Sequence, residues 1–213
     1  MTFQPLSKDE IAIKVAKDLK DGQYVNLGIG LPTLVASFIP HDQEIVLHSE
    51  NGVLGVGPRP LPGEEDIDLI DAGKDFITLK PGASIFHHTD SFIMMRGGHI
   101  DVAVLGALQV SQKGDLANWA TNDKTYPPAV GGAMDLASGA KKIFVIMTHT
   151  TKEGTPKILT ECTFPLTAAE VVTTVYTDLA TVDVSDGQMF VREITPGLTR
   201  TELAKMTGAE LNF

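Results

Sequence analysis

The sequence predicts an α/β fold in which a mainly parallel sheet is flanked by helices. Segments with helical spacing alternate with short apolar segments, and several of the apolar segments contain no polar residue. Strands that are buried on both faces, as in parallel sheets, have such continuously apolar sequences. The 213 residues contain no internal repeat, low-complexity tract or clear linker. We therefore expect one domain over residues 1–213.

The first expected element is a helix that begins after Ser7 and ends before Gly22. Ser7 and Glu10 have the spacing of a capping box, and apolar residues follow at helical spacing. The next expected elements are a strand at 24–27, a helix at 33–39 and a strand at 44–48.

The middle of the chain opens with a segment rich in glycine and proline at 51–64, which predicts a long loop. Long loops in compact domains are often functional. The elements expected after it are strands at 76–79 and 83–86, a helix at 91–95 and a strand at 102–105. Residues 112–128 are polar and predict irregular structure.

The last part of the chain predicts two helices and three apolar segments. Residues 131–136 have the pattern of a turn that enters a helix, and Thr199 and Glu202 form a second capping box whose helix ends before Gly208. The apolar segments lie at 143–147, 171–176 and 189–194, and the first of them predicts a buried strand.

Composition excludes several classes of protein. A net charge of −10 gives no general footprint for nucleic acid or an anionic membrane. An anionic ligand would need a local basic group, backbone amides or another chain. No apolar run approaches the roughly 18 residues of a membrane span, and the start resembles neither a signal nor a transit peptide, so we expect a cytoplasmic protein. The single cysteine, Cys162, excludes an intrachain disulfide and is expected to be a small buried side chain rather than a nucleophile.

A carboxylate stands directly after the second predicted strand, in the turn Ser49-Glu50-Asn51-Gly52. Ligands of open α/β sheets bind at the carboxyl ends of strands. Glu50 is therefore a candidate catalytic group, although an ordinary polar turn would have the same local pattern.

Two glycine-containing turns could present backbone amides to a ligand beside that carboxylate. Residues 26–32 follow a strand and precede a helix, but Thr33 stands where a dinucleotide-binding fingerprint needs its third glycine. Gly131 and Gly132 form the second turn, and adjacent glycines can place donors around an oxyanion. One carboxylate with two such turns suits acyl chemistry.

The sequence resembles the B subunit of the class I 3-oxoacid coenzyme A (CoA) transferases over almost its whole length. The matching motifs lie at 26–32, 49–52, 90–92, 95–99, 114–119, 131–136 and 162–167. The resemblance implies a CoA-transferase fold, which is similar to the architecture of sugar-phosphate isomerases and deaminases. It also implies a ping-pong exchange in which Glu50 forms a mixed anhydride and then a glutamyl-CoA thioester. A carboxylate is already ionised at neutral pH and needs no general base.

The resemblance also implies roles for further residues. Groups expected to stabilise the oxyanion or the thioester are Asn26, Gly28, Gly30, Asn51, Gly131 and Gly132. Possible contacts to substrate or CoA are Lys74, His87, His88 and Arg96. Lys74 could equally be a surface lysine, and Arg96 could equally form a structural ion pair. No metal site is expected, because the histidines lack partners at ligand spacing.

The chain matches only half of a complete enzyme of this kind. We therefore expect its partner to be the CoA-transferase A subunit, in a heterodimer or heterotetramer, with acyl-CoA and carboxylic acids as substrates. No tightly bound cofactor is expected. Residues 62–66 and 86–90 resemble 3-oxoadipate enzymes more than acetoacetate enzymes, which implies 3-oxoadipate rather than acetoacetate as the acceptor. The alternatives of other classes are a sugar-phosphate isomerase-like enzyme and a non-catalytic partner subunit.

Overall fold

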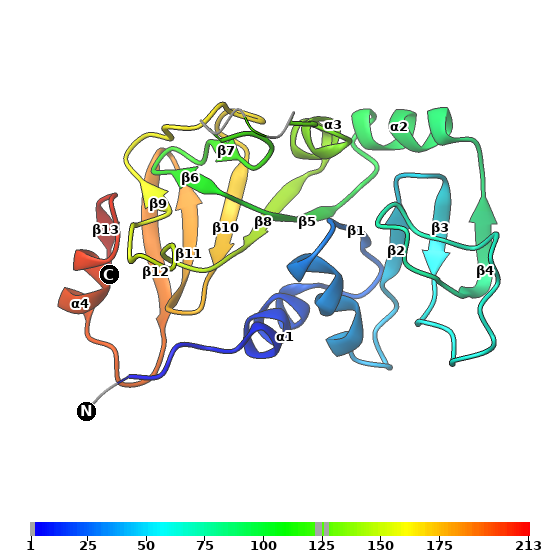
Figure 1. Ribbon diagram of the computed structural model, residues 1–213, viewed down its shortest axis with the longest axis horizontal. Helices are drawn as coiled ribbons and strands as arrows, with labels where there is room; N and C mark the ends of the chain where they lie inside the picture. Colours follow the sequence, from blue (N-terminus) through cyan, green and yellow to red (C-terminus); the bar gives the residue numbers. More distant parts are fainter. Residues whose placement is uncertain (1–2, 122–124, 126–127) are drawn as a thin grey trace.

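The computed structural model describes residues 3–121, 125 and 128–213 (Figure 1). Five parallel strands form the centre of a ten-stranded sheet, and adjacent members are paired in register. In spatial order they are β2 (Val46–Ser49), β1 (Tyr24–Leu27), β5 (Val102–Gly106), β8 (Lys142–Ile146) and β10 (Val172–Tyr176). The predicted α/β class with a mainly parallel sheet is confirmed.

Antiparallel strands extend this centre on both sides. Beyond β2 lie β3 (Val53–Val56) and β4 (Leu79–Ile85), and beyond β10 lie β11 (Ala180–Ser185) and β12 (Gln188–Ile194). The short β13 (Leu211–Asn212) pairs parallel to β12. A separate three-stranded sheet consists of β7 (Leu116–Ala117), β6 (Gln109–Ser111) and β9 (Ile158–Leu159).

Helices cover both faces of the large sheet, as Figure 1 shows. On one face lie α1 (Lys8–Asp18) and the 3₁₀ helix η1 (Leu31–Phe38), and on the other lie α2 (His88–Arg96) and α3 (Ala133–Gly139). The short α4 (Arg200–Lys205) precedes β13. Both predicted capping boxes are confirmed, at Ser7 before α1 and at Thr199 before α4.

The two faces of the sheet belong to two apolar cores. In β5, Val102 and Val104 pack with α1 and η1, whereas Ala103 and Leu105 pack into the core that contains Met95 of α2 and Leu136 of α3. A strand whose alternate residues enter different cores has no face left for polar side chains. This arrangement explains the continuously apolar strands that the sequence contains.

Several boundaries differ from the sequence-based expectations. The predicted loop at 51–64 contains β3, and the two strands expected at 76–79 and 83–86 are a single strand, β4. β4 accommodates Pro81 because it is an edge strand, where a missing N–H costs little. The helix expected at 33–39 is a 3₁₀ helix that begins at Leu31.

Five short strands, β6, β7, β9, β11 and β13, were not expected. They are only two to six residues long. β7 lies inside the segment 112–128 that was predicted to be irregular, of which residues 122–124 and 126–127 lie outside the described part of the chain. Across the described residues, no helix has the length and apolar character needed to cross a membrane.

Two histidines are buried as neutral rings, which makes stability dependent on pH. Burial lowers the pKa of His48 in β2 and of His149 after β8 to about 4 each, with Lys157 adding to the effect at His149. The His149 ring lies between the hydroxyls of Thr177 and Thr207, at 2.9 Å from each.

We expect the free energy of unfolding to fall as the pH drops from about 6.5 to 4, because the unfolded histidines bind protons that the folded ones do not. Each histidine should contribute up to about 3 kcal/mol of this loss. Urea unfolding of the wild type and of the variant His149→Gln at several pH values measures it. If the free energy of unfolding of the variant depended on pH as strongly as that of the wild type, His149 would not be a source of the pH dependence.

Candidate active site

A cavity of about 530 Å³ opens where β1, β2 and β5 end at their carboxyl sides. Its walls come from the ends of these strands, from the turn before α3 and from residues 71–73 of the loop between β3 and β4. Glu50, directly after β2, is part of the wall. The cavity therefore occupies the position where open α/β sheets bind ligands.

The Glu50 carboxylate lies directly against the backbone of Gly132. A Cβ atom built on Gly132 would be 2.1 Å from Oε2 and 3.0 Å from Oε1 of Glu50. Gly132 immediately precedes α3 and is buried. Only glycine allows the carboxylate to approach the chain so closely, so the identity of Gly132 helps to fix where Glu50 lies.

The surroundings of Glu50 make its carboxyl group more basic than in water. Burial raises the pKa of Glu50, His88 opposes this rise, and the negative charge of Asp135 adds to it. Glu50 thus lies near one side chain of α2 and one of α3. A half-buried carboxylate with a raised pKa in a cavity is a functional-site candidate.

A buried polar chain supports the floor of the cavity. The Asn26 side-chain nitrogen lies 3.0 Å from Nδ1 of His48 and donates to the His48 carbonyl at 3.2 Å, while Nε2 of His48 lies 2.8 Å from the Ser91 hydroxyl. Because Nδ1 of the neutral ring faces a donor, Nε2 carries the proton and donates to Ser91. Asn26 lines the cavity, but these bonds of its nitrogen go to His48, which differs from its expected role as a donor to the oxyanion.

Three other predicted donors are placed differently from the expectation. The N–H of Gly28 donates to the carbonyl of Val104 at 2.8 Å, because β1 and β5 still approach each other there. Gly30 is the N-cap that precedes η1, has a positive φ of 87° and lies outside the cavity wall. The side-chain amide of Asn51 donates to the Ile70 carbonyl at 2.7 Å and so anchors the loop that follows β3.

Gly131 and Gly132 both line the cavity beside Glu50. Gly131 has a φ of +57°, which glycine adopts at little cost, and it is exposed. Of the six residues expected to stabilise an oxyanion, Gly132 is the one whose backbone lies directly against the carboxylate, and Gly131 lines the same cavity next to it in the chain.

The two adjacent histidines have different surroundings. His87 is the N-cap of α2, and its Nδ1 accepts a hydrogen bond from the Thr89 N–H at 3.1 Å. The His88 ring packs on Phe92 with 4.6 Å between ring centres, and its charge acts on Glu50. Of the two, His88 is the one whose charge acts on Glu50, although neither histidine is among the residues that line the cavity.

The other two residues predicted to contact substrate or CoA, Arg96 and Lys74, are not among the residues that line the cavity. Arg96 donates from Nε to Asp135 at 2.5 Å, which is the structural ion pair that the sequence left open. Lys74 is exposed on the turn between Asp71 and Asp75 and has a φ of 67°. It lies at the rim of the site rather than among the residues that line the cavity.

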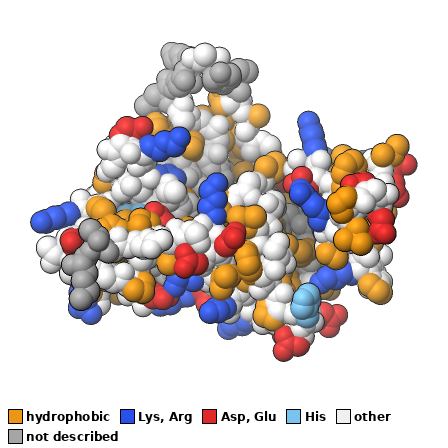
Figure 2. Space-filling view, turned by 60° about the horizontal axis from the view of Figure 1, so that its bottom comes forward, with side chains coloured by type: hydrophobic (Ala, Val, Ile, Leu, Met, Phe, Trp, Pro, Cys, Tyr) orange, Lys and Arg blue, Asp and Glu red, His pale blue; other side chains and the backbone are white. Residues whose placement is uncertain are grey.

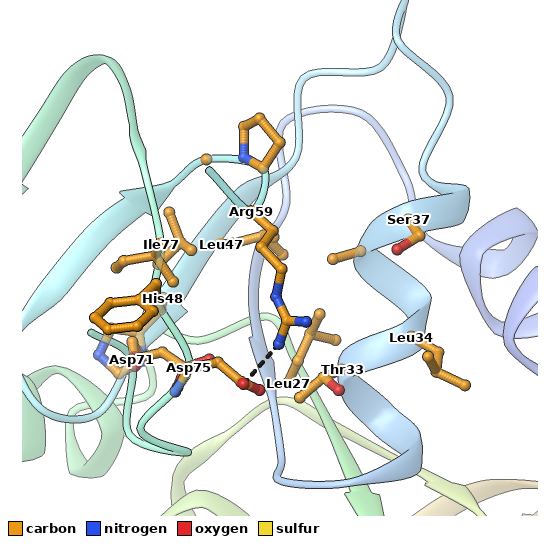
Figure 3. Close-up of a pocket in the computed structure, with 16 residues that line it drawn as sticks. Leu27, Thr33, Leu34, Ser37, Leu47, His48, Arg59, Asp71, Asp75 and Ile77 are labelled. Carbon is orange, nitrogen blue, oxygen red and sulfur yellow. Dashed lines mark hydrogen bonds and ion pairs between the residues drawn. The ribbon is translucent and has the colours of Figure 1, made fainter. Parts of the chain in front are cut away.

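A second cavity, of about 360 Å³, adjoins the first one between η1 and the loop after β3. The two share Leu27, Thr33, Ser49 and Asp71 as wall residues. Figure 3 shows Arg59 reaching across this space to Asp75, with which it pairs at 2.6 Å. Because the two cavities share walls, a ligand bound beside Glu50 in the first cavity would have the space of the second cavity next to it.

Several residues of the site were not singled out from the sequence. Asp135 stands inside a motif but was not given a role. The hydroxyl of Ser49 accepts a hydrogen bond from the Ala72 N–H at 3.0 Å. This bond holds the loop between β3 and β4, whose residues 71–73 line the cavity, against the end of β2. His48 is a polar residue in an otherwise apolar predicted strand. Because buried polar groups need partners, this position could have predicted a buried hydrogen-bond network beside Glu50.

Cys162 and Trp119 do not contribute to a second reactive site in the part of the chain that the structure describes. Burial raises the pKa of Cys162 to about 11, so its thiol stays protonated at neutral pH. Trp119 is half-buried and donates to the Leu166 carbonyl at 3.1 Å. Among the described residues, no three side chains of His, Cys, Asp or Glu are grouped to hold a metal ion.

Comparison with known proteins gives consistent matches. A family model described as Coenzyme A transferase matches residues 8–205. The B subunit of 3-oxoadipate CoA-transferase from Pseudomonas putida is 57% identical over 206 residues, which are 97% of this chain and 96% of that protein. The B subunit of succinyl-CoA:3-ketoacid coenzyme A transferase from Helicobacter pylori is 51% identical over 203 residues, or 95% and 97% of the two chains.

A solved structure shows the same fold. The apoenzyme of an acyl-CoA transferase from Escherichia coli O157:H7 superposes with a TM-score of 0.73 at 19% identity. The match covers 100% of this chain and 44% of that one, so this chain spans less than half the length of that enzyme.

Replacement of Gly132 by alanine should displace the Glu50 carboxylate, because the added methyl group would overlap Oε2. Gly106→Ala is the matched control, since Gly106 lines the same cavity but a Cβ there meets nothing within 4 Å. We expect Gly132→Ala to lose about 1–3 kcal/mol of stability, as overpacked sites do. Urea unfolding and crystal structures of both variants test this. An unmoved carboxylate in Gly132→Ala would show that the contact does not position Glu50.

Proposed function

The chain belongs to the coenzyme A transferase family and is a transferase, and from this premise we propose that Glu50 is the nucleophile of a 3-oxoacid CoA-transferase. The observation that carries the proposal is the Glu50 carboxylate, half-buried in the cavity and pressed against Gly132. Enzymes of this family use CoA thioesters as substrates.

The proposed reaction uses Glu50 twice. An oxygen of the Glu50 carboxylate attacks the thioester carbonyl, and the carbon–sulfur bond breaks. CoA departs as its thiolate, and the product on the enzyme is a mixed anhydride between Glu50 and the acyl group. The thiolate then attacks the glutamyl carbonyl and releases the first carboxylic acid as its carboxylate, which leaves a glutamyl-CoA thioester. The acceptor carboxylate reverses both steps. The thioester energy is conserved because no water enters.

The surroundings of Glu50 suit these steps. A raised pKa makes the carboxylate a stronger nucleophile once it is ionised. Each addition creates an oxyanion, and a single preorganised donor to such an oxyanion is worth about 3–4 kcal/mol in other enzymes. The backbone of Gly132 lies against Glu50, Gly131 lines the same cavity, and these two residues are the part of this chain that we propose for that role.

A second polypeptide completes the proposed enzyme. The similar relatives are named as B subunits, which implies a complementary A subunit. Figure 2 shows hydrophobic side chains gathered on the lobe at the right, which Figure 1 shows to contain β3, β4 and the loop between them. Exposed apolar residues of this part are Leu61, Ile67, Phe76, Leu79 and Ile85. Exposed apolar surface of this kind is typical of protein contacts, and we propose that the partner is the CoA-transferase A subunit, in a heterodimer or heterotetramer.

We propose 3-oxoadipate as the preferred acceptor and succinyl-CoA as the donor. The relative at 57% identity is named for 3-oxoadipate, and the one at 51% for succinyl-CoA and a 3-ketoacid. 3-Oxoadipate and the succinyl group of succinyl-CoA each carry a carboxylate beyond the carboxyl group that reacts, and we propose that His88, whose charge acts on Glu50, meets it. Acetoacetate, which has no second carboxylate, is the alternative acceptor.

In the complex with the A subunit, Glu50→Gln should reduce CoA transfer by at least about 10⁴-fold, because an amide cannot form the anhydride. Incubation with acyl-CoA, followed by borohydride or hydroxylamine and mass spectrometry, should modify Glu50 in the wild type and should modify nothing at this position in Glu50→Gln. Glu161→Gln, at an exposed position outside the cavity, is the control. An unmodified Glu50 in an active complex would favour an isomerase-like enzyme or a purely structural role for this chain.

His88→Ala should lower kcat/KM for 3-oxoadipate about tenfold more than for acetoacetate, because it removes a partner of the second carboxylate. His87→Ala is the matched control: loss of the N-cap should cost about 1 kcal/mol of stability but should not separate the two acceptors. Steady-state kinetics with succinyl-CoA as donor measure both. A wild-type complex that prefers acetoacetate would contradict the proposed acceptor.

A further inference from the structure

Glu50 is connected to Arg96 through one face of α3. The Glu50 carboxylate touches Gly132, and Asp135 follows three residues later, on the same side of the helix. Arg96, the last residue of α2, donates from Nε to Asp135 Oδ1 at 2.5 Å. The Asp135 side chain is 22% exposed and the Arg96 side chain 68% exposed, so Asp135 is the shielded partner, and solvent reaches the pair from the Arg96 side.

The structure fixes Arg96 from two further directions. Its guanidinium lies over the Phe92 ring at 5.8 Å, and Phe92 in turn packs on the His88 ring. Its backbone contacts the end of α3, because a Cβ on Gly139 would be 2.1 Å from the Met95 carbonyl and 3.2 Å from the Arg96 Cα. Arg96 therefore connects α2 to α3 on the same side of α3 as Asp135. The Gly132 backbone, which lies against Glu50, is on that side as well.

We propose that Arg96 is a positioning residue for Glu50, which acts by neutralising Asp135 and by holding α3 against the Glu50 turn. This inference rests on the proposed function, since it concerns the group that would be the nucleophile. Arg96 itself does not contact the substrate in this proposal. It acts through Asp135, which is why the two residues must be tested together.

The charges around Glu50 show why a neutralising group is needed. His88 faces it from α2, Asp135 from α3, and Asp71 lines the same cavity from the loop after β3. The His48 ring below is neutral at pH 7. Without Arg96, the charge of Asp135 would oppose both the ionised form of Glu50 and the anions formed during transfer.

A double-mutant cycle tests the proposal in the complex with the A subunit. The variants are Arg96→Gln, Asp135→Asn and the double variant, with Arg96→Lys as the conservative replacement. Arg200→Gln is the matched control, because Arg200 also stacks on an aromatic ring, that of Phe213, but lies on α4 away from the cavity. Two readouts are used: the pH titration of the Glu50 carboxyl carbon by ¹³C NMR, assigned with Glu50→Gln, and the pH profile of thioester formation in a single turnover.

Arg96→Gln should move the Glu50 titration to higher pH, because Asp135 is then uncompensated. Thioester formation should slow by up to about tenfold on the acid side and recover as the pH rises. Asp135→Asn should move the titration to lower pH, and adding Arg96→Gln to it should change little further. Arg96→Lys should retain most of the wild-type profile, and Arg200→Gln all of it.

The proposal would be overturned if Arg96→Gln changed the Glu50 titration and the rate of thioester formation equally in the wild type and in the Asp135→Asn variant. Arg96 would then act directly on a ligand rather than through Asp135. A loss of rate that is independent of pH, with an unmoved Glu50 titration, would also overturn it and indicate a purely structural role. The NMR titration needs no turnover. If the wild type forms no thioester, the proposed function fails, while the titrations still decide whether Arg96 acts on Glu50.

Discussion

The contact between Glu50 and Gly132 is the constraint on which the site depends. Glu50 directly follows a central strand of the sheet, whereas Gly132 precedes a helix more than eighty positions later in the sequence. The contact therefore requires β2 and α3 to be placed accurately relative to each other. The parallel sheet fixes the end of β2, and the apolar core on one face of that sheet holds α3 through Leu136 and Ala137.

The buried polar chain from Asn26 through His48 to Ser91 serves the same constraint from below. Buried polar groups are costly unless they are paired, and here each one has a partner. The chain joins β1, β2 and α2 at the point where the Glu50 turn begins. A network of this kind favours one arrangement of these three elements over alternatives that leave a polar group unpaired.

Local patterns were sufficient for part of this structure. Capping boxes at Ser7 and Thr199, apolar strands and the carboxylate at the end of β2 all follow from short segments, and the structure has these helices, strands and the carboxylate in place. The partners of Asn26, Gly28 and Asn51 could not be obtained in this way. Asn26 and Ser91 are 22 and 43 positions away from His48 in the sequence and meet it only in the folded protein. The tertiary structure therefore decides which of their polar atoms remain available to a ligand. The strand β3 was missed for a related reason: the glycines in and around it suggested a loop. Gly55 nevertheless adopts a φ of 87° within the strand, where a Cβ would lie 3.0 Å from Ala83 of β4.

The outer edge of the large sheet has a consequence for association with other molecules. Edge strands can recruit a further strand from another chain, and proteins limit this with proline, charged side chains and irregular pairing. β4 combines all three, with Pro81, a register shift opposite β3, and Lys80, whose ammonium is bound to the Ile45 carbonyl at 3.1 Å. At the other end of the sheet, the edge strand β13 is only two residues long. The sheet thus limits its own growth, and association through main-chain hydrogen bonding is disfavoured at both ends, which leaves side-chain surfaces as the means by which this chain selects its neighbours.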